Sequence, residues 1–452
     1  MKKSLLALGV LATPLSAQTS VTIYNDGRVL VRREVPVAVS KGSSSHEVTL
    51  GALDPASLFP LDSGVAITRV SYDGATDEAS ALRRSVGRRV VFRIPESTDT
   101  LSAVVLGVDP LRLQLPDGRI TFQPPGAAMY PAEVVVADPT AAIDLFSTRE
   151  RKTLRLGYFT GGATWQASYQ VTIGGRTARV AGQAVLESQG LRAENADVQL
   201  LAGSVGRAQK APEPPRPYEQ RLAAAEMTMA DQAASEQRVG EFHVYTLPGK
   251  STLLPGLTTS VALFAPADVP YEKTYEVRGL VPYWGILPQQ GEETEAPVEV
   301  SYTLKRPHRA EFGDRPLPGG VARIFQPDSA GRPQLVGEAL MEHTPAGRDL
   351  RLAAGVAFDL TARRVQTGYV TRRDSTAEYG VRTIATADYR VTVRNATDSA
   401  ATVDVIEERM GEWSVVRSSV PAEKLSTVRT RFRVKVPARG ETAVTYRLRI
   451  VW

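Results

Sequence analysis

The chain has 452 residues, no cysteine, and 54 Lys and Arg against 49 Asp and Glu, a formal net charge of +5. The lack of cysteine excludes disulfides, thiol catalysis and Cys-based zinc sites, and the length predicts roughly three or four domains. The basic residues are scattered along the chain, so this small excess does not indicate a nucleic-acid partner.

Residues 1–17 have the layout of a secretory signal peptide. Two lysines at the start precede an apolar run, Leu5–Leu11, and a small-residue exit, Pro14–Ala17. The run is far shorter than the ~20 residues that span a bilayer, and no later stretch predicts a transmembrane helix. We expect cleavage after Ala17 and an exported protein in the periplasm or at the cell surface.

The dominant period of the remaining chain is two, which predicts an all-β protein with little helix. Short strands broken by Gly, Pro, Asn and Asp indicate several serial β-sandwich or small-barrel domains. The first is an N-terminal β module, 18–81, in which Val29, Val31, Val35, Val37 and Val39 alternate. Its "GSSSHE" (42–47) is interpreted as a solvated hairpin turn, because Ser44 beside His46 fits neither a triad nor a nucleophile elbow.

Residues 82–135 predict a small barrel-like insert. The stretch 86–124 reads as four or five short strands, with "PDG" as one turn. Next, "DPTAAIDLFSTRE" (138–150) has a capping Asp138, Pro139 in the first turn and apolar Ile143, Leu145 and Phe146. These signals predict one short connecting helix.

Residues 136–310 predict a β-sandwich domain that opens with "LRLGYFTGGATWQASYQVTI". Gly161 and Gly162 stand where a tight hairpin needs positive φ. Trp165 is interpreted as a core residue rather than a ligand contact. The alternating apolar residues around the glycines are Leu154, Leu156 and Tyr158, then Trp165, Tyr169, Val171 and Ile173. Within this domain, 208–240 is Pro-rich and then Ala/Glu-rich, which predicts a disordered insertion with a transient helix over Tyr218–Gln232.

Residues 311–452 predict a C-terminal, Ig-like β-sandwich. In "RTRFRVKV" (429–436), Phe432, Val434 and Val436 are expected to face the core, with the basic residues between them facing water. The final "YRLRIVW" is interpreted as the last sandwich strand. Its alternation up to Trp452 also suits an outer-membrane barrel, but aromatic residues are only 7% and the strands are short.

The stretches "VTIYNDGRVLVRREVPVAVSKGSSSHEVTLGALDPASL" and "LRLGYFTGGATWQASYQVTI", with "YTLPGKSTLLPGLTTSVALFAPADVPYEKTYEV", give the chain a resemblance to a known family. It resembles the mucoidy-inhibitor-A-like family of bacterial proteins of unknown function. The resemblance implies an influence on capsule or slime at the envelope, and implies no catalytic residues. Many members carry a coiled coil where this chain has 82–135.

No stretch predicts a catalytic, cofactor or metal site. "PGKST" (248–252) lacks the upstream glycine and the following helix of a phosphate-binding loop, and the four histidines stand far apart. The acid groups Glu292, Glu293 and Glu295, and Glu407 with Glu408, leave glycosidase chemistry open. Tyr283 and Trp284 are the tentative contact residues for a glycan or another protein, unless Trp284 plugs a sandwich edge.

Together these observations predict an exported, non-enzymatic binding or scaffolding protein of the cell envelope, whose partner is an envelope protein or a glycan. The first alternative is a hydrolase acting on cell-surface polymer through residues brought together across domains. The second is an outer-membrane-associated β-barrel protein.

Overall fold

The structure is a computed structural model that describes residues 19–95, 98–203, 205–206, 234–278, 291, 293–308, 310–374 and 382–452. The all-β prediction is confirmed: 64% of the chain is strand and 4% is helix. The chain divides into two compact units, one from 1–165, 185–218 and 234–261, the other from 166–184, 219–233 and 262–452. We describe each unit separately.

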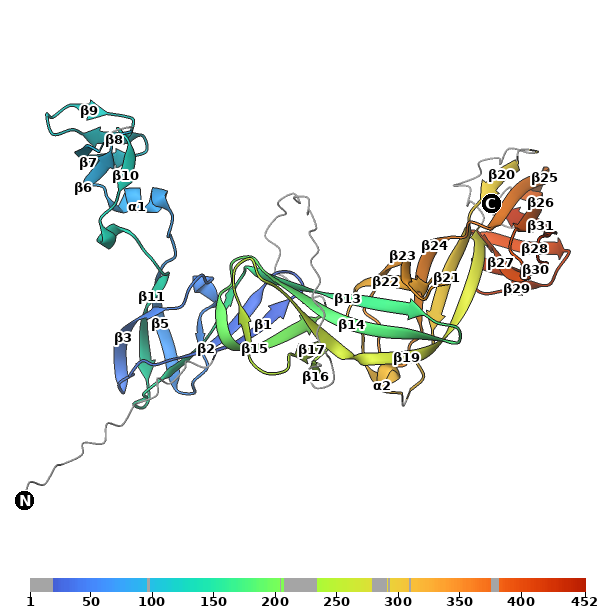
Figure 1. Ribbon diagram of the computed structural model, residues 1–452, viewed down its shortest axis with the longest axis horizontal. Helices are drawn as coiled ribbons and strands as arrows, with labels where there is room; N and C mark the ends of the chain where they lie inside the picture. Colours follow the sequence, from blue (N-terminus) through green and yellow to red (C-terminus); the bar gives the residue numbers. More distant parts are fainter. Residues whose placement is uncertain are drawn as a thin grey trace, which may run out of the picture. The chain divides into compact units, whose positions relative to one another are not determined.

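The largest sheet of the first unit places the first described strand near its middle. Its order is β16 (Ser235–Val239), β17 (Phe242–Thr246), β15 (Ala193–Ala202), β1 (Thr19–Tyr24), β2 (Val29–Val35), β12 (Leu154–Thr160) and β4 (Phe59–Pro60), with β18 (Ser251–Leu253) on β15. Strand β1 runs parallel to β15 and antiparallel to β2 (Figure 1). The sheet therefore combines strands from the beginning of the first unit's sequence, β1 and β2, with strands from its end, β15 to β18.

The prediction of a disordered insertion over 208–240 is partly wrong, because strand β16 lies within this range. Residues Ser235–Val239 form a hairpin with β17 across Gly240, whose φ is +60°. All but Val239 are polar and most are exposed, so this strand has no alternating apolar pattern in the sequence. The predicted helix over Tyr218–Gln232 lies outside the described residues.

The predicted helix over 138–150 is wrong, because Thr140–Ser147 is a strand, β11. It lies between β3 (Gly42–Thr49) and β5 (Val65–Asp73) in a three-stranded antiparallel sheet. Ala141, Ile143 and Leu145 are buried at every second position, whereas Phe146 is 46% exposed. The burial of every second residue is typical of a strand, and it determines the structure here despite the helix-capping residues Asp138 and Pro139.

The "GSSSHE" turn is also wrong, because these residues form most of β3. Ser44 and His46 lie on the same side of the strand, as residues two apart do, and their Oγ and Nε2 atoms are 2.8 Å apart. Alternating small polar residues carry almost no strand signal in sequence, so register with β11 decides the structure here.

Residues 78–129 contain helix α1 (Glu78–Arg84) and a five-stranded antiparallel sheet. The sheet order is β10 (Ala127–Met129), β6 (Arg89–Arg93), β7 (Thr100–Val108), β8 (Leu111–Gln114) and β9 (Ile120–Thr121). Val90, Phe92, Ala103, Val105 and Leu113 make its small core. The short strands and the Gly118 turn, with φ of +87°, follow the pattern read from 86–124.

Gly161 and Gly162 do not join a hairpin, contrary to the prediction. Strand β12 pairs with β2 and β4, whereas β13 (Ala163–Ile173) pairs with β22 and β14 in another sheet. Gly162 has φ of +85°, and its carbonyl accepts hydrogen bonds from the amides of Gly190 and Leu191 at 3.0 and 3.1 Å. The two glycines therefore lie where the chain leaves one sheet and enters another, and the Gly162 carbonyl anchors the loop that contains Gly190 and Leu191.

Trp165 is a core residue, as predicted. It is buried, its Nε1 donates to the carbonyl oxygen of Leu201 at 3.3 Å, and its ring packs on Tyr245. The alternating residues on both sides of the glycines, from Leu154 to Ile173, are buried as well. The indole is fully used in packing.

The second unit contains most of a ten-stranded sheet, and the division between units falls within β13, β14 and β19. The order is β23 (Pro333–Met341), β22 (Gly320–Pro327), β13, β14 (Thr177–Ser188), β19 (Thr258–Arg278), β27 (Ala401–Glu408), β30 (Arg429–Val436) and β29 (Ala422–Lys424). Strand β21 (Val298–Leu304) joins β19 to β24 (Leu350–Val356). Helix α2 spans Glu311–Asp314.

The C-terminal part of the second unit is a β-sandwich. One sheet is β20 (Glu293–Ala296), β25 (Leu360–Asp374), β26 (Arg382–Asn395), β31 (Glu441–Val451) and β28 (Glu412–Ser418). It packs on β27, β30 and the ends of β19 and β21 through one continuous apolar core (Figure 1). Phe432, Val434 and Val436 are buried in that core, as predicted, and β31 is the last strand.

Among the described residues, no helix has the length and apolar character needed to cross a bilayer.

Replacing Gly162 with alanine should lower the free energy of unfolding by about 1–3 kcal/mol, because an L-residue there must adopt positive φ. The new Cβ would also lie 2.9 Å from the Leu191 amide nitrogen. Urea denaturation of the purified protein measures the loss. Gly161→Ala is the matched control, since its Cβ would meet nothing closer than 3.8 Å. Equal free energies of unfolding for the two variants would contradict the role assigned to Gly162.

Candidate functional site

The residues singled out in sequence do not form one site. Tyr283, Trp284 and Glu292 lie outside the described residues, so their proposed contact and acid roles stay predictions. Glu293 and Glu295 lie on strand β20 rather than in a loop tip, and Glu293 is 3.7 Å from Arg363 on β25. This pairing makes Glu293 part of an ordinary cross-strand ion pair.

Glu407 and Glu408 are neighbours on β27, and their side chains lie on opposite faces of the strand. Glu407 lies in the sandwich core and is 1% exposed. Glu408 is on the outer face, where its carboxylate is 3.4 Å from the guanidinium of Arg429. The two carboxylates therefore cannot flank one substrate.

Glu407 is the centre of a buried ionic cluster in the C-terminal sandwich. Its carboxylate accepts hydrogen bonds from Arg364 at 2.9 and 3.0 Å, from Arg409 at 2.8 Å and from the Tyr446 hydroxyl at 2.7 Å. Burial alone would raise the pKa of Glu407, but the two guanidinium groups lower it below the ordinary value of 4.5. Burial, together with the Glu407 charge, raises the pKa of Tyr446 well above its ordinary value.

Tyr389 completes this cluster. Its hydroxyl accepts a hydrogen bond from Arg409 at 2.9 Å, and the Arg364 guanidinium lies 4.2 Å from its ring centroid. All five side chains are buried. The cluster joins the two sheets, and most of its polar atoms are bonded within it, although the buried Arg364 Nε has no hydrogen-bond partner.

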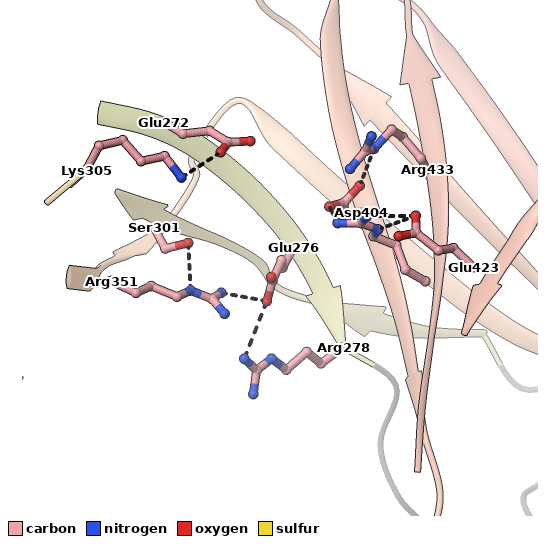
Figure 2. Close-up of polar contacts among 10 residues, drawn as sticks. Glu272, Glu276, Arg278, Ser301, Lys305, Arg351, Asp404, Glu423 and Arg433 are labelled. Atoms are coloured by element: carbon pink, nitrogen blue, oxygen red, sulfur yellow. Dashed lines mark hydrogen bonds and ion pairs between the residues drawn. The ribbon is translucent and has the colours of Figure 1, made fainter. Parts of the chain in front are cut away.

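The outer face of the sheet formed by β24, β21, β19, β27, β30 and β29 carries alternating charges, and we call it the ionic face (Figure 2). Arg351 and Arg278 converge on Glu276 at 2.8 and 3.4 Å. Arg431 and Arg433 approach Asp404 at 3.3 and 3.2 Å.

Glu276 and Asp404 lie side by side, and in this respect they resemble the paired carboxylates of a glycosidase. They are neighbours in the parallel pairing of β19 and β27, and they are only 9% and 6% exposed. A glycosidase needs one carboxyl group that donates a proton and one free to attack or to activate water. Here each carboxylate is occupied by two arginines, so the arrangement favours an ion-pair network.

A polar hollow of about 520 Å³ opens on the second unit, on β25, β26, β31 and β28. Two β-bulges flank its centre, at Thr367 in β25 and at Val416 in β28. Bulges often occur beside functional sites because they redirect side chains. The lining residues are Thr367, Asp388, Tyr389, Arg417, Ser418, Ser419, Thr445 and Tyr446.

Asp388 is the charged centre of the polar hollow. Arg447, directly opposite on β31, donates to both carboxylate oxygens at 2.7 and 2.8 Å. Arg417, which lies opposite Arg447 on the next strand, β28, is 3.5 Å from Asp388. The hydrogen bonds from Arg447 and the charges of both arginines lower the pKa of Asp388 below its ordinary value.

The lining of the polar hollow is rich in hydrogen-bonding groups. Four Ser and Thr side chains lie around the Asp388 carboxylate and the Arg417 guanidinium, and the side chain of Arg417 is 67% exposed. No histidine is among the described residues that line the hollow. Such a lining suits a ligand rich in hydroxyl or amide groups.

The four histidines are dispersed, as their sequence separation suggested. His46 contacts Ser44, His243 lies 2.7 Å from Glu236, His308 lies 3.2 Å from Asp314, and His343 accepts from the Gly319 amide. Among the described residues, no group of three or more His, Asp or Glu is arranged to hold a metal ion. In "PGKST", Lys250 pairs with Asp197 between two strands.

No protein-family model matches the chain, and no curated protein matches it.

The polar hollow left little trace in the sequence. Asp388 lies in "ADYRVTV", which reads as an ordinary alternating strand, and Arg447 is 59 residues further along the chain. The bulges that shape the hollow depend on strand register, which no local pattern specifies. The one available signal is the acidic residue on an otherwise apolar and basic strand.

Glu407→Gln should lower the free energy of unfolding at pH 7 by about 3–5 kcal/mol, because it leaves two buried guanidinium groups without their anion. Glu408→Gln is the matched control and should cost at most about 1 kcal/mol, since its ion pair is at the surface. Urea denaturation measures both.

The loss should depend on pH with a definite sign. The pKa of Glu407 is lowered in the folded protein, so its contribution is fully present above 4.5 and disappears as pH falls through the folded value. The stability difference between wild type and Glu407→Gln should therefore shrink in acid. If the stability difference instead grows in acid, the account of Glu407 as an ionised partner of the two buried arginines is wrong.

Proposed function

We propose that the protein is an exported cell-envelope protein that binds a glycan at the polar hollow and does not transform it. The observation that carries this proposal is the lining of the hollow, where hydroxyl groups surround the Asp388–Arg447 pair. Sugar hydroxyls both donate and accept hydrogen bonds, and this set of side chains offers partners for both.

The protonation chemistry supports binding over hydrolysis. A general acid needs a pKa near the working pH, but Arg447 and Arg417 lower the pKa of Asp388. Glu276 and Asp404 are each occupied by two arginines. No observation among the described residues specifically favours the hydrolase alternative.

The envelope location rests on the sequence. The signal-peptide layout of residues 1–17 supports export, and the resemblance to the mucoidy-inhibitor-A-like family supports a place near capsule or slime polymer. A glycan ligand fits both supports and the polar hollow. An envelope protein as partner is the alternative outcome of the binding experiment below.

Export should release a mature chain that begins at Gln18. Intact-mass spectrometry and N-terminal peptide mapping of the protein from the exported fraction of the native host should find that start. Full-length protein that begins at Met1, or retention in the cytoplasm, would contradict the export part of the proposal.

Arg417→Gln should weaken glycan binding by about 10-fold or more, because it removes a charge-assisted donor worth ~1.5–3 kcal/mol. Binding is measured by calorimetry against purified capsular and cell-wall oligosaccharides. Arg439→Gln is the matched control, since Arg439 is also an exposed, ion-paired arginine and does not line the hollow. Its binding should equal that of wild type.

Three results would contradict glycan binding at the hollow: no oligosaccharide binds wild type, Arg417→Gln binds as well as Arg439→Gln, or reducing ends are released during incubation. Capture of an envelope protein that Arg417→Gln no longer recruits would instead assign the hollow to a protein partner.

A further inference from the structure

The first unit contains a second cavity, distinct in character from the polar hollow. It has a volume of about 460 Å³ and lies over β1, β2 and β12. Val21, Val31 and Tyr158 stand in one row across these three strands, because the registers pair Val21 with Val31 and Val31 with Tyr158. We call this cavity the Arg33 pocket.

The floor of the Arg33 pocket is apolar. Val21, Val31 and Tyr158 are buried, and Leu50 and Leu191 reach it from the loops above the sheet. Small-ligand sites are typically concave and mainly apolar, with a few polar groups that fix orientation. The Arg33 pocket joins an apolar floor to rims that carry polar and charged groups, whereas no aliphatic side chain is among the described residues that line the polar hollow.

The loop 50–52 that forms one rim is held in place by two tyrosines. The Tyr158 hydroxyl donates to the Leu50 carbonyl at 2.8 Å, and the Tyr72 hydroxyl donates to the Gly51 carbonyl at 3.0 Å. A rim fixed by its own hydrogen bonds loses little entropy when a ligand arrives.

The opposite rim, 190–194, is held by the glycine turn that precedes β13. The Gly162 carbonyl accepts from the amides of Gly190 and Leu191, and the Ser188 hydroxyl donates to the Leu191 carbonyl at 2.6 Å. The positive φ of Gly162 thus serves a loop that lines the pocket. Both rims are formed before any ligand binds.

Arg33 supplies the pocket with a positive charge that makes no ion pair with a described residue. Its guanidinium donates a long hydrogen bond, 3.4 Å, to the Thr49 carbonyl and also interacts with the Tyr158 side chain. The other arginine of the lining, Arg192, is instead occupied by Glu194 at 2.8 and 3.0 Å. Burial raises the pKa of Tyr158, so its hydroxyl stays neutral and does not supply a counter-ion.

Asp138 also lines the pocket, is exposed, and makes no ion pair with a described residue. A cavity that combines a guanidinium and a carboxylate, neither ion-paired with a described residue, and an apolar floor matches a ligand with a carboxylate, an N–H donor and an apolar group. An amino-acid residue with a free α-carboxylate has these three features in one unit, whereas a fatty acid lacks the donor.

We propose that the Arg33 pocket binds an apolar amino-acid residue by its free α-carboxylate. Arg33 binds the carboxylate, Asp138 accepts from the α-nitrogen, and the side chain packs on Val21, Val31 and Tyr158. The ligand is either a free amino acid or the C-terminal residue of a peptide, since both have this chemistry.

Calorimetry of the mature protein with four probes tests the proposal: leucine, acetyl-alanyl-leucine, its C-terminal amide, and octanoate. We expect leucine or the acetylated dipeptide to bind, and the amide to bind at least about 10-fold more weakly because it lacks the charge that Arg33 pairs with. Tighter binding by leucine would identify a free amino acid, and tighter binding by the dipeptide a peptide C-terminus.

Arg33→Gln should reduce the affinity for the favoured probe at least about 10-fold. Arg32→Gln is the matched control, because Arg32 is the next residue on β2, donates to Thr22 at 3.0 Å and does not line the pocket. Ala52→Trp should block the pocket from its exposed rim while leaving the core intact.

The proposal is overturned if neither leucine nor the dipeptide binds, if the amide binds as well as the carboxylate, or if octanoate binds best. It is also overturned if Arg33→Gln and Arg32→Gln have equal effects at unchanged melting temperature. None of these results bears on glycan binding at the polar hollow, which lies in the other unit.

Discussion

The C-terminal sandwich depends on the contact between Glu407 and the two arginines buried with it. Arg364 and Arg409 lie within the apolar core, and each would be strongly destabilising there without the carboxylate between them. The chain has no cysteine, so no disulfide holds the sheets while these groups find one another. Apolar alternation therefore brings the sheets together, and the ionic cluster selects the one arrangement that satisfies it.

The same physical rule governs the outward-facing carboxylates of this unit. Asp388, Glu276 and Asp404 each lie within ion-pair distance of two arginines. A carboxylate so occupied accepts hydrogen bonds and does not deliver a proton. This is why we propose the polar hollow as a binding site.

Much of the fold was predictable because burial alternates along each strand. The cores around Trp165 and Phe432 followed directly from that period. The prediction failed at β11, where Asp138 and Pro139 have the pattern of a helix start but precede a strand. It also failed at β3 and β16, whose mainly polar residues lack the apolar alternation that indicates a strand. That the strands before and after Gly162 pair with other strands rather than with each other could not be foreseen, since pairing partners are set by tertiary contacts.

The sites were less predictable than the fold. The Arg33 pocket and the polar hollow both join residues far apart in sequence, such as Val21 with Tyr158 and Asp388 with Arg447. Each residue alone looks like part of an alternating strand. Only the register brings an arginine that makes no ion pair with a described residue over an apolar floor, or a carboxylate between two bulges.

The central claim is that arginines keep the key carboxylates ionised, so that the second unit binds without catalysing. Carbon-13 NMR titration of labelled Asp and Glu carboxyl groups tests it directly, with Glu407→Gln and Asp388→Asn to assign the two signals. We predict that both carboxyl groups titrate below their ordinary pKa values. Titration of either group between about pH 6 and 8, where a general acid must act, would contradict the account.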